Sequence, residues 1–323
     1  MTDEYNIPCK RLLVERNTMD NLNEMKCCKV EDLKEDREAI HGDLKMIRDW
    51  LKKQPHLNVR DDDESLLIFL RSSKYSIQRT KEKIENYYSM YSLLPDLFND
   101  RDPFSPEIQA LLSVGTMVPL PNPIGHCGPR IVLIVYDDYD PEVIPYTAVI
   151  KSCLMIFDIL MIEDLNTAVS GVYILCDLGR CPLKYVLQFS PTYVTKHVYC
   201  METGYPLRLK GIQVENCPTA LEVTIAIAKA CLRGKIRDRL HVYSDNKDLQ
   251  KVIPLELMPI EYGGKNGSVR ELGPIWKSKV ESYSNWFRDC AKYKTNEDLR
   301  PGKPRTTCSE LGIEGSFRKL VVD

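Results

Sequence analysis

Residues 205–264 read YPLRLKGIQVENCPTALEVTIAIAKACLRGKIRDRLHVYSDNKDLQKVIPLELMPIEYGG, and this stretch decides the fold. A strand-like run, Leu209 to Val214, leads through Asn216-Cys217-Pro218 into a helical pattern that is apolar over most of its circumference. The polar exceptions share one narrow strip: Glu222, Lys229 and Arg233. Such a helix is either buried on several sides, or it covers an internal cavity with one face and offers the other to a membrane. The second alternative makes it a lid.

Strands and helices alternate through the middle of the chain. The apolar runs that predict strands are Ile131–Tyr136, Gly171–Cys176, Leu209–Val214 and Leu240–Tyr243. Helical patterns cover residues 147–164, 182–202 and 219–232, with a shorter one over Lys247–Val252. Near-continuous apolar strands separated by helices predict a largely parallel sheet with both faces covered.

The sequence before and after this region is helical. Patterns over 31–53, after the Asp61–Asp63 caps and over 76–94 predict a small all-α domain. A further helix is predicted over Trp276–Tyr293, after which the apolar end of the chain is expected to dock back. The predicted division is therefore a loosely ordered lead (1–28), a helical domain (29–100), an α/β domain (101–267) and a C-terminal helix and tail (268–323).

Composition restricts the class of protein. The chain of 323 residues is 43% hydrophobic and 28% charged, and 44 Lys and Arg against 46 Asp and Glu give a net charge of −2, so no nucleic-acid partner is expected. The 12 cysteines form no CxxC pair and no zinc-finger spacing, so neither a metal nor a cofactor is predicted. We expect a monomeric cytoplasmic protein with reduced thiols, since no secretory signal opens the sequence. No apolar run approaches the ~20 residues of a membrane span, so any membrane contact is expected to be peripheral and reversible.

The order of motifs resembles a known family. An aromatic-Pro pair, a basic strand, Asn-x-Pro, the apolar helix and a Lys/Arg cluster are followed by Met258–Gly264, MPIEYGG. Upstream, Asp61–Arg71, DDDESLLIFLR, is similar to the N-terminal helical signature of the same family. Together these motifs resemble the CRAL-TRIO lipid-binding family, above all its tocopherol- and retinaldehyde-binding members. The resemblance implies an α/β fold: a small N-terminal helical bundle, then a domain with a mostly parallel sheet as the pocket floor and a mobile helical lid.

An apolar pocket needs many apolar walls and few polar groups that fix the orientation of the ligand. Two sets recur on one face of their elements: Val172, Ile174 and Cys176 on a strand, and Cys153, Phe157 and Met161 on the preceding helix. By spacing alone the same pattern is typical of any α/β core. The resemblance places these positions around a lipid, together with Phe189, Cys200, Met201, Leu207, Leu221 and Ile225.

Asp158 lies in the same helix, and the resemblance implies that this position lines the pocket. A carboxylate there could accept a hydrogen bond from a ligand hydroxyl, whereas an unpaired buried charge would be costly. Asp158 also shares a helical stripe with Lys151, which allows the alternative that both side chains face solvent.

Four cations flank the apolar helix. Arg208 and Lys210 are two residues apart on an extended segment, and Lys235 and Arg239 are four apart on a helical one. A charge run of this kind is usually a solvated face. The resemblance, however, implies that these four positions bind phosphoinositide headgroups.

These observations predict a carrier that binds a hydrophobic small molecule, such as a retinoid, tocopherol or carotenoid, and transfers it between membranes. Phosphoinositide binding at the basic cluster would open the lid. One alternative is a phosphoinositide-responsive adaptor with little or no cargo transfer. An enzyme acting on an isoprenoid or retinoid is a second alternative, although the five scattered histidines and the absence of GxGxxG and GxSxG patterns predict no catalytic set.

Overall fold

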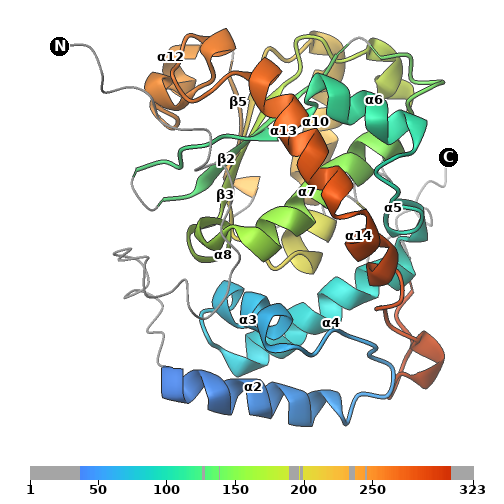
Figure 1. Ribbon diagram of the computed structural model, residues 1–323. Coiled ribbons are helices and arrows are strands. Elements are labelled where there is room, and N and C mark those ends of the chain that lie inside the picture. Colours follow the sequence, from blue (N-terminus) through green and yellow to red (C-terminus); the bar gives the residue numbers. More distant parts are fainter. Residues whose placement is uncertain are drawn as a thin grey trace, which may run out of the picture.

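The computed structural model describes residues 37–125, 128–137, 139–188, 196, 199–232, 237–243 and 246–306. The N-terminal part is helical, as predicted, and in Figure 1 its blue and cyan helices lie beneath the sheet-containing part. Its helices are α2 (Arg37–Leu51), α3 (Asp63–Ser72), α4 (Ile77–Leu93), α5 (Pro95–Phe98) and α6 (Pro106–Val114). The side chain of Asp62 caps α3 by accepting a hydrogen bond from the Ser65 amide at 2.8 Å.

A five-stranded sheet in the order β1-β2-β3-β4-β5 forms the centre of the molecule. Its strands are β1 (Met117–Pro119), β2 (Arg130–Val135), β3 (Val172–Asp177), β4 (Leu209–Glu215) and β5 (Leu240–Tyr243). Strands β2 to β5 are parallel to their neighbours, and β1 is antiparallel to β2. The predicted α/β class with a mostly parallel sheet is confirmed. The short antiparallel β1 was missed, because it lies in a proline-rich connection that has no alternating pattern.

The connections between the parallel strands carry the helices that surround the sheet. They are α7 (Tyr146–Glu163), α8 (Leu165–Ser170), the 3₁₀-helix η3 (Leu183–Leu187), the π-helix η4 (Cys200–Gly204) and α10 (Thr219–Cys231). The short helix α12 (Asn246–Leu249) follows β5. The prediction of one helix over 182–202 was wrong at its ends, where a 3₁₀-helix and a π-helix stand instead. α7 is the most buried helix, since 14 of its 18 residues are buried.

The C-terminal part packs against both other parts of the molecule. After the short turns η5 (Leu255–Leu257) and η6 (Ile260–Tyr262), helix α13 (Val269–Ser282) lies against α6, β1 and α7, as Figure 1 shows. The predicted single helix over 276–293 is instead two, because α13 ends at Tyr283 and α14 (Ser284–Cys290) begins directly after it. A last 3₁₀ turn, η7 (Glu297–Leu299), follows.

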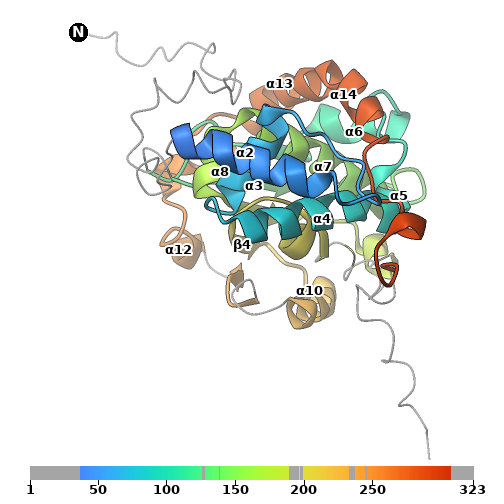
Figure 2. The same ribbon diagram turned by 90° about the horizontal axis from the view of Figure 1, so that it is seen from below.

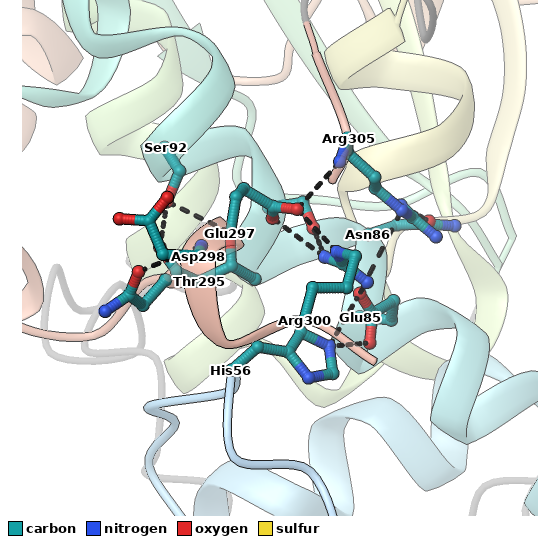
Figure 3. A network of polar contacts seen from close by, with 11 residues as sticks. His56, Glu85, Asn86, Ser92, Thr295, Glu297, Asp298, Arg300 and Arg305 are labelled. Carbon is teal, nitrogen blue, oxygen red and sulfur yellow. Dashed lines mark hydrogen bonds and ion pairs between the residues drawn. The ribbon is translucent and has the colours of Figure 1, made fainter. Parts of the chain in front are cut away.

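Residues 294–306, here called the strap, bind the C-terminal end to the N-terminal helices (Figure 3). Thr295 forms a β-bridge with Leu57, and the Asn296 amide donates to the His56 carbonyl at 2.8 Å. Arg300 forms ion pairs with Glu85 of α4 and with Glu297 of the strap itself. A second contact of the strap with α4 comes from Arg305, whose Nη1 donates to the Asn86 side chain at 2.9 Å.

An aromatic cleft of about 850 Å³ separates α3 and α4 from α13 and α14. The Arg60 guanidinium lies 5.4 Å from the ring centre of Trp286 and 4.7 Å from that of Tyr293. Arg60 also forms an ion pair with Asp289 at 2.6 Å. Met161 of α7 lines this cleft, so one member of the predicted lipid set faces the boundary with the N-terminal helices.

Candidate functional site

Helix α10, predicted as the lid, has two different faces. Leu221 is buried and Ile225 is half-buried, and both lie on its inner side, while Leu232, directly after the helix, is buried as well. The outer side is exposed and largely apolar, with Val223 67% exposed and Ala220, Ala226 and Ala230 also exposed. Figure 2 shows α10 at the edge of the molecule, and its principal packing partner is η3. An apolar surface helix that is exposed on its apolar outer side is unusual in a water-soluble protein and is typical of a membrane or partner contact.

Most residues of the predicted lipid set lie inside the molecule. The buried members are Cys153, Phe157, Met161, Val172, Ile174, Cys200, Met201, Leu207 and Leu221, while Cys176 and Ile225 are half-buried. Phe189 lies outside the described residues. Phe157 packs against Tyr205, with ring centres 6.3 Å apart. Burial alone does not separate pocket walls from core, so the lipid contacts of this set stay a prediction.

Asp158 is completely buried and lies in a polar cluster between α4 and α7. Its Oδ2 forms an ion pair with Arg101 at 2.5 Å, and its Oδ1 accepts a hydrogen bond from Tyr87 at 3.1 Å. Arg101 also donates to the Tyr91 hydroxyl at 2.9 Å. The alternative that places Asp158 in solvent is therefore wrong, because both carboxylate oxygens are bound by protein groups in the interior. Burial still outweighs these partners and raises the pKa of Asp158.

Arg208 has a structural position. Its guanidinium donates to three main-chain carbonyls, those of Val169 (2.5 Å), Arg71 (2.5 Å) and Ser72 (3.3 Å), at the C-terminal ends of α8 and α3. Three of its five N–H groups are used in this way. Gly171 lets the main chain of Arg208 come close, because a Cβ at residue 171 would lie 2.0 Å from the Arg208 carbonyl oxygen. The φ of Gly171 is +87°, which also favours glycine. Arg208 thus joins the N-terminal helices to the sheet.

One of the four predicted cations contacts the segment that carries two of the others. Arg239 donates to the carbonyl of Leu209 at 2.8 Å, so its guanidinium reaches the segment that carries both Arg208 and Lys210. Arg239 and Lys210 are half-buried. Lys235 lies outside the described residues. Sequence spacing had paired these residues within their own elements, and the hydrogen bond to Leu209 joins Arg239 to the segment of Arg208 and Lys210.

A polar cleft of about 450 Å³ adjoins Arg208. It lies between the α3–α4 junction and η4, and its charged lining residues are Lys74, Arg79, Glu82, Lys83, Glu202 and Arg208. Four cations therefore face two carboxylates. Lys74, Arg79 and Lys83 could not be predicted from the sequence, because isolated cations in a helical region look like a solvated face. The positive φ of Lys74, +53°, marks the site, but it is known only from coordinates.

One residue connects this cleft with the interior. Lys83 donates to the main-chain carbonyl of Tyr205 at 3.1 Å, and burial lowers the pKa of Lys83. The ring of Tyr205 packs against both Tyr87 and Phe157. In η4, Glu202 and Thr203 line the cleft, whereas the adjacent Cys200 and Met201 are buried. The π-helix therefore has one side on the polar cleft and the other on the core.

The described residues hold neither a group of metal ligands nor a membrane-spanning helix. No group of three or more His, Cys, Asp or Glu side chains could hold a metal ion among them. Within the same residues, no helix is long and apolar enough to cross a membrane.

Comparisons with known proteins agree with this architecture. The model of the CRAL/TRIO domain matches residues 117–264, and the model described as Pinta-like, UBA domain matches residues 36–108. An alpha-tocopherol transfer protein-like protein of Homo sapiens is 31% identical over 244 residues, which are 74% of this chain and 69% of that protein. Clavesin-1 of Xenopus laevis is 24% identical over 235 residues, or 72% of this chain and 70% of that protein.

Among solved structures, "Crystal structure of Sfh5" matches 76% of this chain and 98% of that one, with a TM-score of 0.49 and 12% identity. The family assignment depends on the sequence relatives, because the human protein is 31% identical and is covered over 69% of its length. In addition, the domain model matches the segment from β1 to η6, which contains the whole sheet. The chain belongs to the CRAL/TRIO family.

Proposed function

We propose that this protein carries an apolar lipid and exchanges it at membranes, with α10 as the gate. Family membership and relatives that include an alpha-tocopherol transfer protein-like protein support lipid binding in general. In this proposal the ligand lies between α7, β3 and the inner side of α10, where Phe157, Ile174 and Leu221 are buried. The division of the chain at residues 100 and 267 stays a prediction.

The two-faced burial of α10 carries this proposal. Its buried inner residues give the gate a closed position, and its exposed outer residues give it a surface that can enter the membrane interface. Val223 of α10 is 67% exposed and Leu183 of the neighbouring η3 is 57% exposed. Because α10 packs principally against η3, these two apolar side chains belong to one membrane-facing surface.

The polar cleft is the proposed phosphoinositide site. Lys74, Arg79 and Lys83 supply cations at its wall, and Lys210 and Arg239 supply charge on the far side of Arg208. Arg208 itself is mainly a positioning residue, since its guanidinium holds the carbonyls of α3 and α8. An anionic headgroup would complete the cleft, and its contacts with η4 and Lys83 would reach the core through Tyr205.

A vesicle experiment tests the headgroup assignment. The Lys74→Ala/Arg79→Ala variant should lose about 2 kcal/mol of membrane binding, since each near-surface cation contributes about 1 kcal/mol, which is roughly thirtyfold in partitioning to vesicles containing phosphatidylinositol bisphosphate. Binding to plain phosphatidylcholine vesicles should not change. The matched control is Lys45→Ala/Lys52→Ala, two exposed lysines of the N-terminal region outside the cleft lining.

Mass spectrometry of organic extracts from the gently purified protein tests the carrier itself. We expect one class of apolar lipid, which decreases when the protein is incubated with acceptor vesicles. Vesicle binding without any extractable lipid would favour the adaptor instead. Equal binding of the cleft variant and the wild type to phosphoinositide vesicles would contradict the headgroup site while leaving the carrier intact.

A further inference from the structure

The junction between β4 and α10 has an unusual backbone. Glu215 is the last residue of β4, Asn216 follows with a left-handed φ of +51°, and α10 begins at Thr219 after Pro218. A non-glycine residue at positive φ is uncommon and needs support from its surroundings. Here the support is the Asn216 side chain, whose Nδ2 donates to Oδ1 of Asp177 at 3.0 Å. Three residues thus separate the sheet from the proposed gate.

Asp177 is a fixed acceptor at this junction. Besides Asn216, the Tyr262 hydroxyl donates to its Oδ2 at 2.6 Å, and the Gly179 amide donates to its Oδ1 at 3.0 Å. The Leu178 amide, next to Asp177, donates to the main-chain carbonyl of Glu215 at 3.1 Å. The carboxyl end of β3 therefore holds the start of the gate segment.

Glu215 is the anomaly in this arrangement. It pairs in register with Asp177 on the adjacent parallel strand, so the two carboxyl groups lie on the same face of the sheet. Glu215 is only 1% exposed, and its Oε1 is buried without a hydrogen-bond partner. A carboxylate in this position would be repelled by Asp177 and would lack the donors that a buried charge requires.

Titratable groups approach Glu215 from three elements. Asp177 of β3 and Tyr243 of β5 pair with it in register, and Tyr262 of η6 interacts with its charge. Cys176 of β3 also interacts with that charge, although it points to the opposite face of the sheet. Burial, followed by the charge of Asp177, raises the pKa of Glu215 to about 7. Its charge therefore changes in the neutral range, where an ordinary glutamate is fully ionised.

We propose that Glu215 is a positioning residue for the gate: as a neutral acid it holds the β4–α10 junction closed, and as a carboxylate beside Asp177 it loosens that junction. This inference rests on the proposed role of α10. The neutral acid can donate a proton to a hydrogen bond, whereas the carboxylate gains hydration only if the junction moves. The pKa is raised in the closed state, so the stability of that state is fully present at low pH and is lost as pH rises through 7.

Hydrogen–deuterium exchange of α10 peptides in the full-length protein tests this assignment without any lipid. With a closed-state pKa of about 7 and an open-state value near 4.5, opening should increase about tenfold between pH 6 and pH 8 after correction for intrinsic exchange. The Glu215→Gln variant, which is always neutral, should show the same protection at both values. Glu222→Gln is the matched control, because Glu222 is an exposed acid in the first turn of α10, and it should keep the tenfold change.

A wild-type protein whose α10 protection does not change with pH would overturn the proposal, as would a Glu215→Gln variant that keeps the full change. Vesicle transfer distinguishes this failure from that of the carrier. Normal lipid transfer without a pH effect contradicts the assignment of Glu215 alone. A tenfold pH effect in a protein that transfers no lipid supports the role of Glu215 at the β4–α10 junction and contradicts the proposed carrier function.

Discussion

At the scale of single residues, Arg101 and Asp158 form an ion pair inside the molecule. Both side chains are almost completely buried, with exposed fractions of 1% and 0%. A buried ion pair costs several kcal/mol in desolvation, which its own attraction and hydrogen bonds roughly offset, so its removal as a pair differs from the removal of one partner. Tyr87 and Tyr91 add hydroxyl contacts to the cluster, while the Nε of Arg101 is buried without a hydrogen-bond partner among the described residues.

Replacing one partner should therefore destabilise the fold strongly. In Asp158→Asn, the Arg101 charge stays buried without its counter-ion, and we expect the free energy of unfolding to fall by roughly 3–5 kcal/mol. The double variant Arg101→Met/Asp158→Leu should recover most of that loss. Urea denaturation monitored by circular dichroism measures both. If the double variant were no more stable than Asp158→Asn, the polar cluster would contribute more to the free energy of unfolding than the apolar packing that replaces it.

Asp158 also shows where residue-level reasoning from the sequence ends. The resemblance to the CRAL-TRIO family implied that this position lines the pocket. The structure buries its side chain in an ion pair with Arg101, and the pocket role stays a prediction. The partner could not be predicted, because Arg101 is 57 residues away in a polar, proline-rich segment that has no helical or strand periodicity. The same limit applies to Lys74 and Arg79, which line the polar cleft only because α4 packs against η4.

At the scale of elements, the predictions succeeded where the period of the pattern and the burial agreed. Strand β5 was predicted at its observed bounds, and β2, β3 and β4 were predicted to within one residue. Strands β2 to β4 are mostly buried, so their apolar runs are nearly continuous, whereas His241 and Val242 of β5 are exposed. The single helix predicted over residues 182–202 was wrong at its ends, because the apolar spacings of a 3₁₀-helix and a π-helix overlap those of an α-helix. Tertiary contacts decide which of the three forms.

The outer face of α10 leads to a prediction for that element alone. Val223→Asp should leave the midpoint of thermal unfolding within about 2 °C of the wild type, because the side chain is already 67% exposed. It should reduce binding to phosphoinositide vesicles several-fold, since a charge would have to enter the interface. Vesicle co-sedimentation measures this effect. Val143→Asp is the control, because Val143 is 70% exposed and belongs to a different segment, and it should bind like the wild type.

At the scale of the whole molecule, the strap joins the two ends of the described chain. Glu297 accepts hydrogen bonds from the Arg300 side chain at 2.8 Å and from the Arg305 amide at 2.8 Å. Desolvation opposes these bonds, but together with the charge of Arg300 they lower the pKa of Glu297 to about 2. In Figure 3 this network connects the strap with α4 through Glu85 and Asn86.

The strap should therefore be sensitive to acid. A depressed carboxyl pKa contributes stability that is present above about 4.5 and is lost as pH falls toward 2. Glu297→Gln should lower the free energy of unfolding at pH 7 by about 1 kcal/mol, and the difference from the wild type should shrink at pH 3. Urea titrations at the two pH values measure it. A constant difference would mean that the side chain acts by shape and not by charge.

Trp286 can serve as an intrinsic fluorescence reporter, because the guanidinium of Arg60 lies between its ring and that of Tyr293. The chain has three tryptophans, and only Trp286 of the three lines the aromatic cleft, where a cation lies 5.4 Å from its ring centre. If α14 separated from the segment before α3, that ring would lose its cation and meet water. The emission of Trp286, isolated by Trp50→Phe/Trp276→Phe, would shift to longer wavelength, so docking of the N-terminal helices could be followed in real time during vesicle encounters.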